Sequence, residues 1–317
     1  MNERGRRSAP KFEVQLTAPD IDRWREGNMG IAGFTSQDSG RPGPHVAITA
    51  LSHGNEVAGA IVLDELLCRG LRPVRGRLTL GFLNLAAFDR FDPRQPTLSR
   101  FVDEDLNRVW DIATLESRRN SLELERARAV RPLIDTVDVL FDLHTMLWPS
   151  DPLMLCGVPE KGRVLADGIG IPALVVADAG HAGGRRLIDY GRFSAPSSAY
   201  VANLLEAGQH WQPCSVEVMH AAIAGLLNHL RMAPPELPPP ARQKQRFAEV
   251  TRAVVAGSPG FAFVQPWRGG EIIARRNTLI ALDGEEEIRT PHDECLLVMP
   301  SLRPSRGHTA VRLARFA

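Results

Sequence analysis

A histidine and a glutamate lie three positions apart at the point where an apolar segment ends. Residues 45–51 (HVAITAL) have the length and composition of a buried strand, and SHGNE follows directly at 52–56. Open α/β sheets bind their ligands at the carboxyl ends of such strands. A catalytic zinc needs three N or O ligands, and His53 and Glu56 are able to supply two of them. The third is missing from this segment.

A second segment, FDLHT at 141–145, offers the third ligand. His144 ends another predicted strand, 137–143, whose carboxyl end should lie at the same edge of the sheet. Asp142 is placed two residues earlier to orient the imidazole by accepting a hydrogen bond. Taken alone, each histidine is more typical of an ordinary hydrogen-bonded residue than of a metal ligand. The occurrence of two such loops in one α/β pattern is what favours a metal site.

Between these segments lies the polar stretch SRFVDEDLNRVW at 99–110. The planar guanidinium of Arg108 suits a carboxylate, and Asn107 beside it adds neutral donors, so the two are candidates for binding an anionic substrate group. Arg100 is a candidate partner for an oxyanion. By composition alone, the stretch is more typical of a solvated loop with ordinary salt bridges.

Together, these segments resemble the succinylglutamate desuccinylase and aspartoacylase family, which is related to the zinc carboxypeptidases. The resemblance rests on three motifs in matching order and spacing: H-G-N-E at 53–56, R-x-x-x-x-D-L-N-R at 100–108 and D-L-H-T at 142–145. It covers residues 45–230 and, more loosely, the C-terminal region. It implies one zinc ion per chain, bound by His53, Glu56 and His144. It also implies oxyanion stabilisation by Arg100 and binding of the substrate carboxylate by Asn107 and Arg108.

The resemblance further implies a general base, a glutamate at the end of a late strand before a glycine-containing turn. LEAGQ at 205–209 is similar to that pattern, which makes Glu206 the candidate base. A base must reach the attacking water within hydrogen-bond distance, and the end of a strand permits this. Glu217 is the competing candidate, but its place inside an apolar helical pattern suits a structural role.

The surrounding pattern predicts an α/β fold. Apolar runs at 45–51, 77–85 and 137–143 have strand length, and segments 56–68, 122–134 and 216–230 have helical spacing; shorter strands are expected at 153–156, 173–177 and 201–205. This alternation predicts a mixed, mostly parallel sheet with helices on both faces, as in zinc carboxypeptidases. The first 44 residues are expected to contain an edge strand and loops.

A proline-rich segment suggests a domain boundary. MAPPELPPPARQ at 232–243 contains five prolines, which no helix can accommodate. Short β-rich pieces follow, at 250–255, 260–264, 271–274, 278–282, 296–299 and 310–313. We therefore expect a catalytic α/β domain at 1–233, a linker at 234–243 and a small C-terminal β domain at 244–317.

Composition limits the possible partners. The 317 residues include 38 Lys plus Arg and 37 Asp plus Glu, so the net charge of +1 provides no global field to attract nucleic acid or an anionic membrane. The basic opening MNERGRR is not followed by the apolar core of a signal peptide, and there is no run of about 18 apolar residues. A cytoplasmic protein is expected. The four scattered cysteines are expected to be free and mostly buried.

The sequence thus predicts a zinc-dependent amidohydrolase that cleaves a small N-acyl amino acid into a carboxylic acid and an amino acid. Desuccinylase, aspartoacylase and deacetylase specificities all stay open. The Gly- and Arg-rich loop at 178–186 either lines the pocket and meets a second anionic group or is a surface turn. A metallocarboxypeptidase acting on peptides is the nearest alternative, and a non-catalytic binding protein is the more distant one. The oligomeric state is not readable from the sequence.

Overall fold

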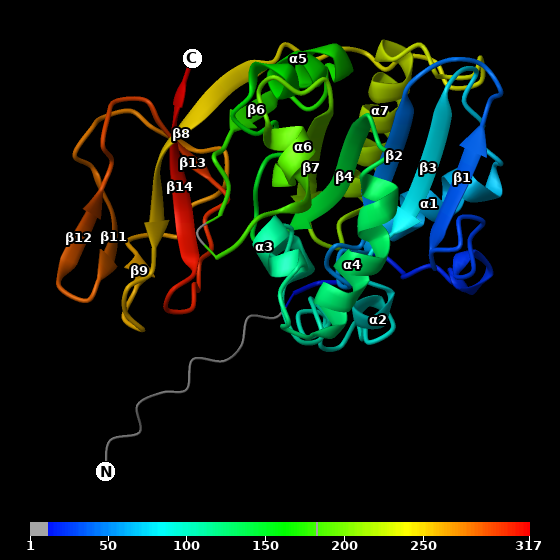
Figure 1. The fold of residues 1–317 in the computed structure, drawn as a ribbon. Coiled ribbons are helices and arrows are strands. Elements are labelled where there is room, and N and C mark those ends of the chain that lie inside the picture. Colours follow the sequence, from blue (N-terminus) through cyan, green and yellow to red (C-terminus); the bar gives the residue numbers. More distant parts are fainter. Residues whose placement is uncertain (1–11, 182) are drawn as a thin grey trace.

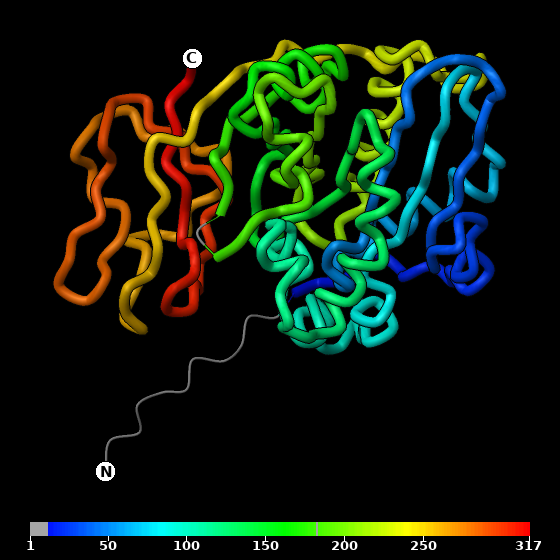
Figure 2. The backbone as a smooth tube through the Cα atoms, viewed as in Figure 1, coloured from blue at the N-terminus to red at the C-terminus, as the bar shows by residue number. Residues whose placement is uncertain are grey.

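The computed structural model describes residues 12–181 and 183–317 (Figures 1 and 2). The basic opening segment considered above therefore lies outside the described residues. The N-terminal elements occupy one end of the molecule and the C-terminal strands the other, with the middle of the chain between them (Figure 2).

The described residues form helices, short 3-10 turns and strands, whose bounds are as follows. The helices are α1 (Val57–Cys68), α2 (Leu85–Phe88), α3 (Ile112–Leu115), α4 (Leu122–Ile134), α5 (Glu160–Ile169), α6 (Gly191–Ser194) and α7 (Pro213–His229), with 3-10 turns η1 (Asp22–Trp24), η2 (Leu106–Arg108) and η3 (Leu187–Asp189). The strands of the first part are β1 (Phe34–Asp38), β2 (His45–Ala50), β3 (Arg77–Phe82), β4 (Val139–Met146), β5 (Leu153–Leu155), β6 (Leu174–Ala177) and β7 (Val201–Gln209). The strands of the last part are β8 (Arg246–Val255), β9 (Ala262–Phe263), β10 (Ile272–Ile273), β11 (Leu279–Asp283), β12 (Glu286–Arg289), β13 (Cys295–Val298) and β14 (Thr309–Phe316).

One large sheet runs through the molecule in the order β1-β3-β2-β4-β7-β5-β6-β8-β14-β13-β10. Strands β3, β2, β4 and β7 are parallel neighbours, and β1 pairs antiparallel with β3 at the edge. Every residue of β2 and β4 is buried, as expected for strands covered on both faces. The predicted mixed, mostly parallel α/β sheet is confirmed.

Two hydrophobic clusters show how helices cover the sheet. Residues of α1, α5 and α7 pack on one face, and residues of α4 and α6 pack on the other. Because side chains alternate along a strand, neighbouring residues of β4 belong to different faces. Leu140 and Met146 face the α4 side, whereas Phe141 and Leu143 face the α1 side. Asp142 and His144 therefore lie on the α4 side.

Two strands are longer than predicted. β4 continues past His144 to Met146, and β7 continues past Leu205 to Gln209. The pairing between them shifts register after His144, where Gly208 adopts a φ of +123° that favours glycine. Glu206 therefore lies inside β7, just before this irregularity, and not at the end of the strand.

The C-terminal strands extend the same sheet. β8 pairs parallel with β6, and β14 pairs antiparallel with β8, so hydrogen bonds connect the two sides of the proline-rich segment. β9, β11 and β12 form a separate three-stranded sheet. β12 was not predicted, because its sequence EEIR lacks an apolar alternation and it pairs only at an edge. The division at 234–243 into two domains stays a prediction.

All four cysteines are free, as predicted, but only Cys156 and Cys295 are buried. Cys68 is exposed because it ends α1, and Cys214 is exposed in the first turn of α7. Within the described ranges, no helix combines the length and apolar character that crossing a membrane requires.

Candidate metal centre

His53, Glu56 and His144 converge in the folded chain. His53 follows β2, Glu56 is the N-cap residue of α1, and His144 lies on β4. One ligand atom from each lies within 4.8 Å of the others, and all three side chains are buried. The Glu56 carboxylate lies between the two rings, 2.6 Å from His53 Nδ1 and 3.1 Å from His144 Nδ1. Although burial opposes ionisation, the two imidazoles hold the pKa of Glu56 well below its usual range.

The loop between β2 and α1 is held in place by backbone contacts. Leu51 leaves the strand with a φ of +61°, an unusual conformation for a leucine. A Cβ on Gly54 would come within 2.3 Å of the Ala87 carbonyl carbon, so only glycine fits there. The Gly54 N–H donates to the carbonyl of Arg100 at 3.1 Å, and the Thr145 N–H donates to Glu56 Oε2 at 3.1 Å. These contacts orient the candidate ligands His53 and Glu56.

Two aspartates contact the outer nitrogens of the imidazoles. Asp142 Oδ2 lies 2.7 Å from His144 Nε2, which confirms the predicted contact, and Asp105 Oδ1 lies 3.0 Å from His53 Nε2. When His144 Nε2 carries a proton and donates to Asp142, the His144 Nδ1 lone pair points at the Glu56 side of the cluster. His53 Nε2 lies between Asp105 and a second neighbour, Arg100 Nη2, at 2.8 Å. Two imidazole nitrogens and a carboxylate, each supported in this way, fit a divalent transition metal. The role of Asp105 was missed, although it stands in the D-L-N-R motif.

Arg100 lies beside this cluster. Its Nη2 donates to Asp105 Oδ2 at 3.0 Å, and its Nη1 is 3.8 Å from Glu56 Oε1. The side chain keeps 37% of its surface exposed. This placement is compatible with the predicted oxyanion role, which stays a prediction.

Asn107 and Arg108 lie in η2, which follows Asp105. Asn107 Oδ1 accepts a hydrogen bond from the Leu187 N–H at 2.8 Å, so this oxygen is occupied by a structural contact. Its Nδ2 faces the cluster, 3.5 Å from His144 Nε2. Among the described residues, Arg108 has one weak ion pair, 4.0 Å from Asp105, and burial lowers the pKa of Arg108 to about 10. Both groups keep donors for an anion, and their substrate-binding role stays a prediction.

The loop that carries Arg100 is anchored by a residue that sequence reasoning missed. Glu123, fully buried in the first turn of α4, accepts hydrogen bonds from three successive backbone N–H groups, residues 102–104, and from Asn84 Nδ2. Its position in a charged amphipathic helix predicts a solvent-exposed glutamate. The sequence therefore does not indicate that Glu123 anchors this loop.

Glu206 pairs in register with His144 across β4 and β7. Its Oε2 is buried and has no hydrogen-bond partner among the described residues, which is costly for a carboxylate unless a further molecule binds it. Burial raises the pKa of Glu206 to about 8, although the charges of His144 and Arg312 oppose the rise. The competing candidate, Glu217, is exposed on α7.

The Gly- and Arg-rich loop packs against the η2 segment. Arg185 pairs with Val109 in an isolated bridge, and a Cβ on Gly184 would lie 2.1 Å from the Arg108 carbonyl oxygen. Arg186 is buried between Asp178 and Asp189, with contacts of 2.8 and 2.6 Å, so it is already neutralised. The Arg185 side chain is exposed. Ala182 lies outside the described residues.

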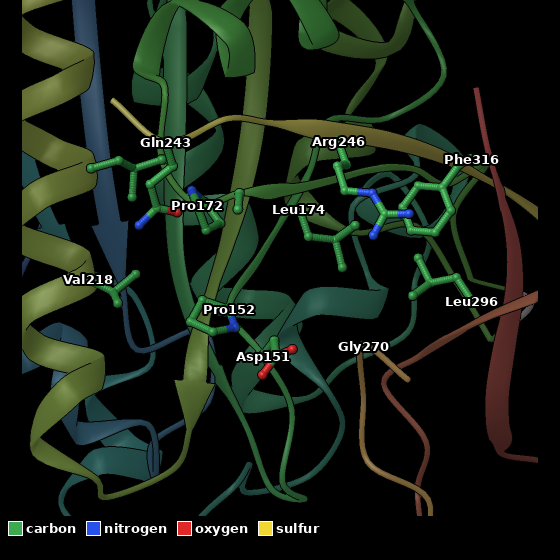
Figure 3. A pocket seen from close by; sticks show the side chains of 12 residues that line it. Asp151, Pro152, Pro172, Leu174, Val218, Gln243, Arg246, Gly270, Leu296 and Phe316 are labelled. Atoms are coloured by element: carbon green, nitrogen blue, oxygen red, sulfur yellow. The ribbon is translucent and has the colours of Figure 1, made fainter. Parts of the chain in front are cut away.

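A separate cavity of about 310 Å³ lies between α7 and the C-terminal strands (Figure 3). Val218, Pro172 and Leu174 line one part of it, and Arg246 stacks on the Phe316 ring at 3.6 Å in another. The metal-ligand cluster does not line this cavity. Its lining is mostly apolar and does not include the groups that the predicted chemistry requires.

Comparison with known proteins identifies a family to which the sequence is similar. Residues 42–233 match the family model of the succinylglutamate desuccinylase/aspartoacylase catalytic domain. The aspartoacylase of Xenopus tropicalis is 31% identical over 114 residues, which cover 32% of this chain and 34% of that protein. The matched part thus spans about a third of the length of the curated relatives.

Solved structures share the fold over most of the chain. Succinylglutamate desuccinylase from Vibrio cholerae superposes with a TM-score of 0.65 at 16% identity, covering 90% of this chain and 85% of that one. A succinylglutamate desuccinylase/aspartoacylase from Rhodobacter sphaeroides gives 0.65 at 18% identity, covering 90% and 89%. The fold and the cluster of potential metal ligands define an α/β protein with a candidate metal site. The chain belongs to the succinylglutamate desuccinylase/aspartoacylase family.

Proposed function

We propose that this protein is a zinc-dependent amidohydrolase that removes the acyl group from a small N-acyl amino acid. The observation that carries the proposal is the convergence of His53, Glu56 and His144, with Asp105 and Asp142 in contact with the outer nitrogens of the two rings. Membership of a family named for a desuccinylase and an aspartoacylase supports the choice of reaction. The three ligands would hold one zinc ion.

Zinc bound there would supply Lewis acidity, polarising the amide carbonyl and lowering the pKa of water. The chain supplies the rest. Glu206, opposite His144, takes the proton of the attacking water and passes it to the nitrogen of the leaving amine. Its unpartnered Oε2 and its raised pKa, about 8, suit a group that gains and loses a proton near neutrality.

The arginines stabilise negative charge. Arg100 donates to the oxygen that becomes negative when water adds to the carbonyl, a contact that strengthens as charge develops. Asn107 Nδ2 and the Arg108 guanidinium bind the substrate carboxylate, which holds the amide in one orientation. Collapse of the tetrahedral state breaks the C–N bond and leaves a carboxylic acid and a free amino acid.

Metal analysis followed by a substrate panel tests the proposal. The purified chain should bind one zinc per molecule, and the zinc-loaded protein should hydrolyse at least one of a set of N-acetyl, N-succinyl and N-formyl amino acids. Zinc-loaded protein that is inactive on the whole panel would refute the proposed reaction. Cleavage of peptides longer than three residues would instead favour a carboxypeptidase.

Two variants separate the roles. Glu206→Gln should keep zinc and lose activity by at least about 100-fold, the scale of a general base; Glu217→Gln, an exposed glutamate on α7, is the matched control and should keep wild-type activity. His144→Ala should lose zinc affinity. Wild-type rates in Glu206→Gln would exclude this base, and full zinc occupancy in His144→Ala would exclude this ligand set.

A further inference from the structure

A buried histidine that has no part in the proposed reaction lies just beyond the candidate base. His210 follows the last residue of β7, and only 3% of its surface is exposed. Its Nδ1 lies 2.6 Å from the hydroxyl oxygen of Thr145, the residue that follows His144 on β4. Thr145 is itself buried, and its backbone N–H donates to Glu56 Oε2 at 3.1 Å. A single residue thus separates His210 from a candidate metal ligand.

The strand pairing around Thr145 is irregular. The register of β4 against β7 shifts between His144 and Met146, so one residue, Thr145, lies opposite two residues of β7. A bulge of this kind takes a residue out of the regular ladder, and bulges are frequent beside active sites. The His210 side chain contacts Thr145 across the bulge, and the His210 N–H donates to the Met146 carbonyl at 2.7 Å. His210 therefore fixes both Thr145 and the residue after it.

The next residue contacts the loop on the other side of Glu56. Trp211 packs against the His210 ring, with ring centroids 5.0 Å apart, and its Nε1 donates to the Asn55 carbonyl at 2.9 Å. Asn55 immediately precedes Glu56 in the chain. Trp211 is buried and has a φ of +62°, which is uncommon for a residue other than glycine. The turn after β7 thus contacts the loop that carries Glu56 and the strand whose N–H binds its carboxylate.

The His210 ring makes these contacts without adding a charge to the cluster. Burial lowers the pKa of His210 to about 4, so the ring is neutral at pH 7. A neutral imidazole nitrogen either donates or accepts, and a hydroxyl does both, so Nδ1 pairs with Thr145 in either tautomer. An uncharged ring does not compete with a cation for the Glu56 carboxylate.

We propose that His210 is a positioning residue for Glu56, which acts through Thr145 and fixes the orientation of the carboxylate. This inference rests on the proposed function, since it concerns the zinc site, and goes beyond it by assigning a role to residues outside the ligand set. If Thr145 moves, Glu56 Oε2 loses the N–H that orients it. Loss of the His210 contact should therefore weaken zinc binding. A purely structural role, in which His210 only stabilises the bulge, makes a different prediction.

Zinc affinity of the full-length protein, measured by competition with a chelator, tests this without a substrate. His210→Phe keeps a ring but removes Nδ1, and it should weaken zinc binding about 10-fold, the lower end of the range for residues that orient metal ligands. Thr145→Val removes only the hydroxyl and should have a similar effect. His210→Asn places an amide atom where Nδ1 lies, and should restore the affinity to within about threefold of the wild type.

A double variant and a matched control separate positioning from stability. If both residues act through one contact, His210→Phe combined with Thr145→Val should bind zinc within about twofold of the weaker single variant. His45 Nε2 lies 2.8 Å from Thr79 Oγ1, a second buried histidine–threonine contact, at the opposite end of β2 from the site. Thr79→Val should lower the urea midpoint of unfolding, as Thr145→Val does, but leave zinc affinity unchanged.

The outcomes distinguish this inference from the proposed function. Zinc affinity within about threefold of the wild type in either His210→Phe or Thr145→Val, whatever its effect on unfolding, would overturn the inference and leave the hydrolase proposal intact. Losses that multiply in the double variant, or no rescue by His210→Asn, would overturn it as well. If His210→Phe does not fold, Thr145→Val compared with Thr79→Val decides. Wild-type protein that binds no zinc would overturn the proposed function and the inference with it.

Discussion

Replacement of Glu123 by glutamine tests whether a buried carboxylate on α4 organises the site. Oε1 accepts from the Val102 N–H at 2.6 Å and from Asn84 Nδ2 at 3.0 Å. Oε2 accepts from the N–H groups of Asp103 at 3.0 Å and Glu104 at 3.2 Å. A carboxylate satisfies all four donors. A glutamine amide has one oxygen, so its NH₂ group must face two of these donors in either orientation.

The cost follows from the two hydrogen bonds lost. Hydrogen bonds to a charged acceptor contribute about 1.5–3 kcal/mol each, which sets an upper range of about 3–6 kcal/mol. The loop is partly exposed at Asp103, so water replaces part of the loss when the loop loosens. We expect Glu123→Gln to lower the free energy of unfolding by about 2–4 kcal/mol. Displacement of Arg100 by about 1 Å should also lower kcat/KM by about 100-fold.

Urea unfolding and steady-state kinetics measure the two effects, with Glu125→Gln as the matched control. Glu125 lies in the same first turn of α4 but is exposed, so its replacement removes the same charge from the helix N-terminus without breaking the loop contacts. Glu125→Gln should cost less than about 0.5 kcal/mol. Equal destabilisation by the two substitutions would refute the role of Glu123, and unchanged kcat/KM in a destabilised Glu123→Gln would refute the link to Arg100.

Further predictions concern the metal centre, the adjoining loop and the thiols. Asp142→Asn should weaken zinc binding about 10- to 100-fold, measured by competition with a chelator, because His144 loses its charged partner and the single amide oxygen cannot serve both His144 and Thr49; unchanged affinity would contradict this. Gly184→Ala should lower the unfolding midpoint by several degrees, because its φ is +137° and the added Cβ meets the Arg108 carbonyl oxygen at 2.1 Å; a wild-type midpoint would show that the loop packs differently. A thiol reagent that reacts by disulfide exchange should, at pH 8, modify the two exposed cysteines of the native protein and spare Cys156. Burial raises the pKa of the Cys156 thiol to about 12. Rapid modification of Cys156 in the native state would contradict the core packing.

Sequence periodicity was sufficient to predict the parallel part of the fold. The apolar runs at 45–51 and 77–85 and the helix at 122–134 are strongly patterned, because elements buried on one or both faces must be apolar at regular positions. The structure has them as β2, β3 and α4. β12 and the ends of β4 and β7 were missed or misplaced, because edge pairing and a register shift depend on the neighbouring strand and not on local composition.

The metal-ligand cluster was predictable for a related reason. Strand ends of a parallel sheet meet at one edge, so His53 and His144 could be brought together from their positions alone, and the Asp142 contact follows from a spacing of two. The contacts of Asp105 and Glu123 required the folded loop. Their carboxylates look like ordinary surface charges in the sequence.

The sequence by itself determined the candidate ligands, the family motifs and the α/β pattern, because each depends on residue types at short and regular separations. Tertiary structure alone decided which arginines are buried and which carboxylates they meet. Arg186 is neutralised by two aspartates, whereas Arg312, more than a hundred positions from the nearest predicted site residue, lies buried on the face of Glu206. The physical reason is that burial and charge compensation arise from contacts between strands that are adjacent in the sheet but distant in the chain.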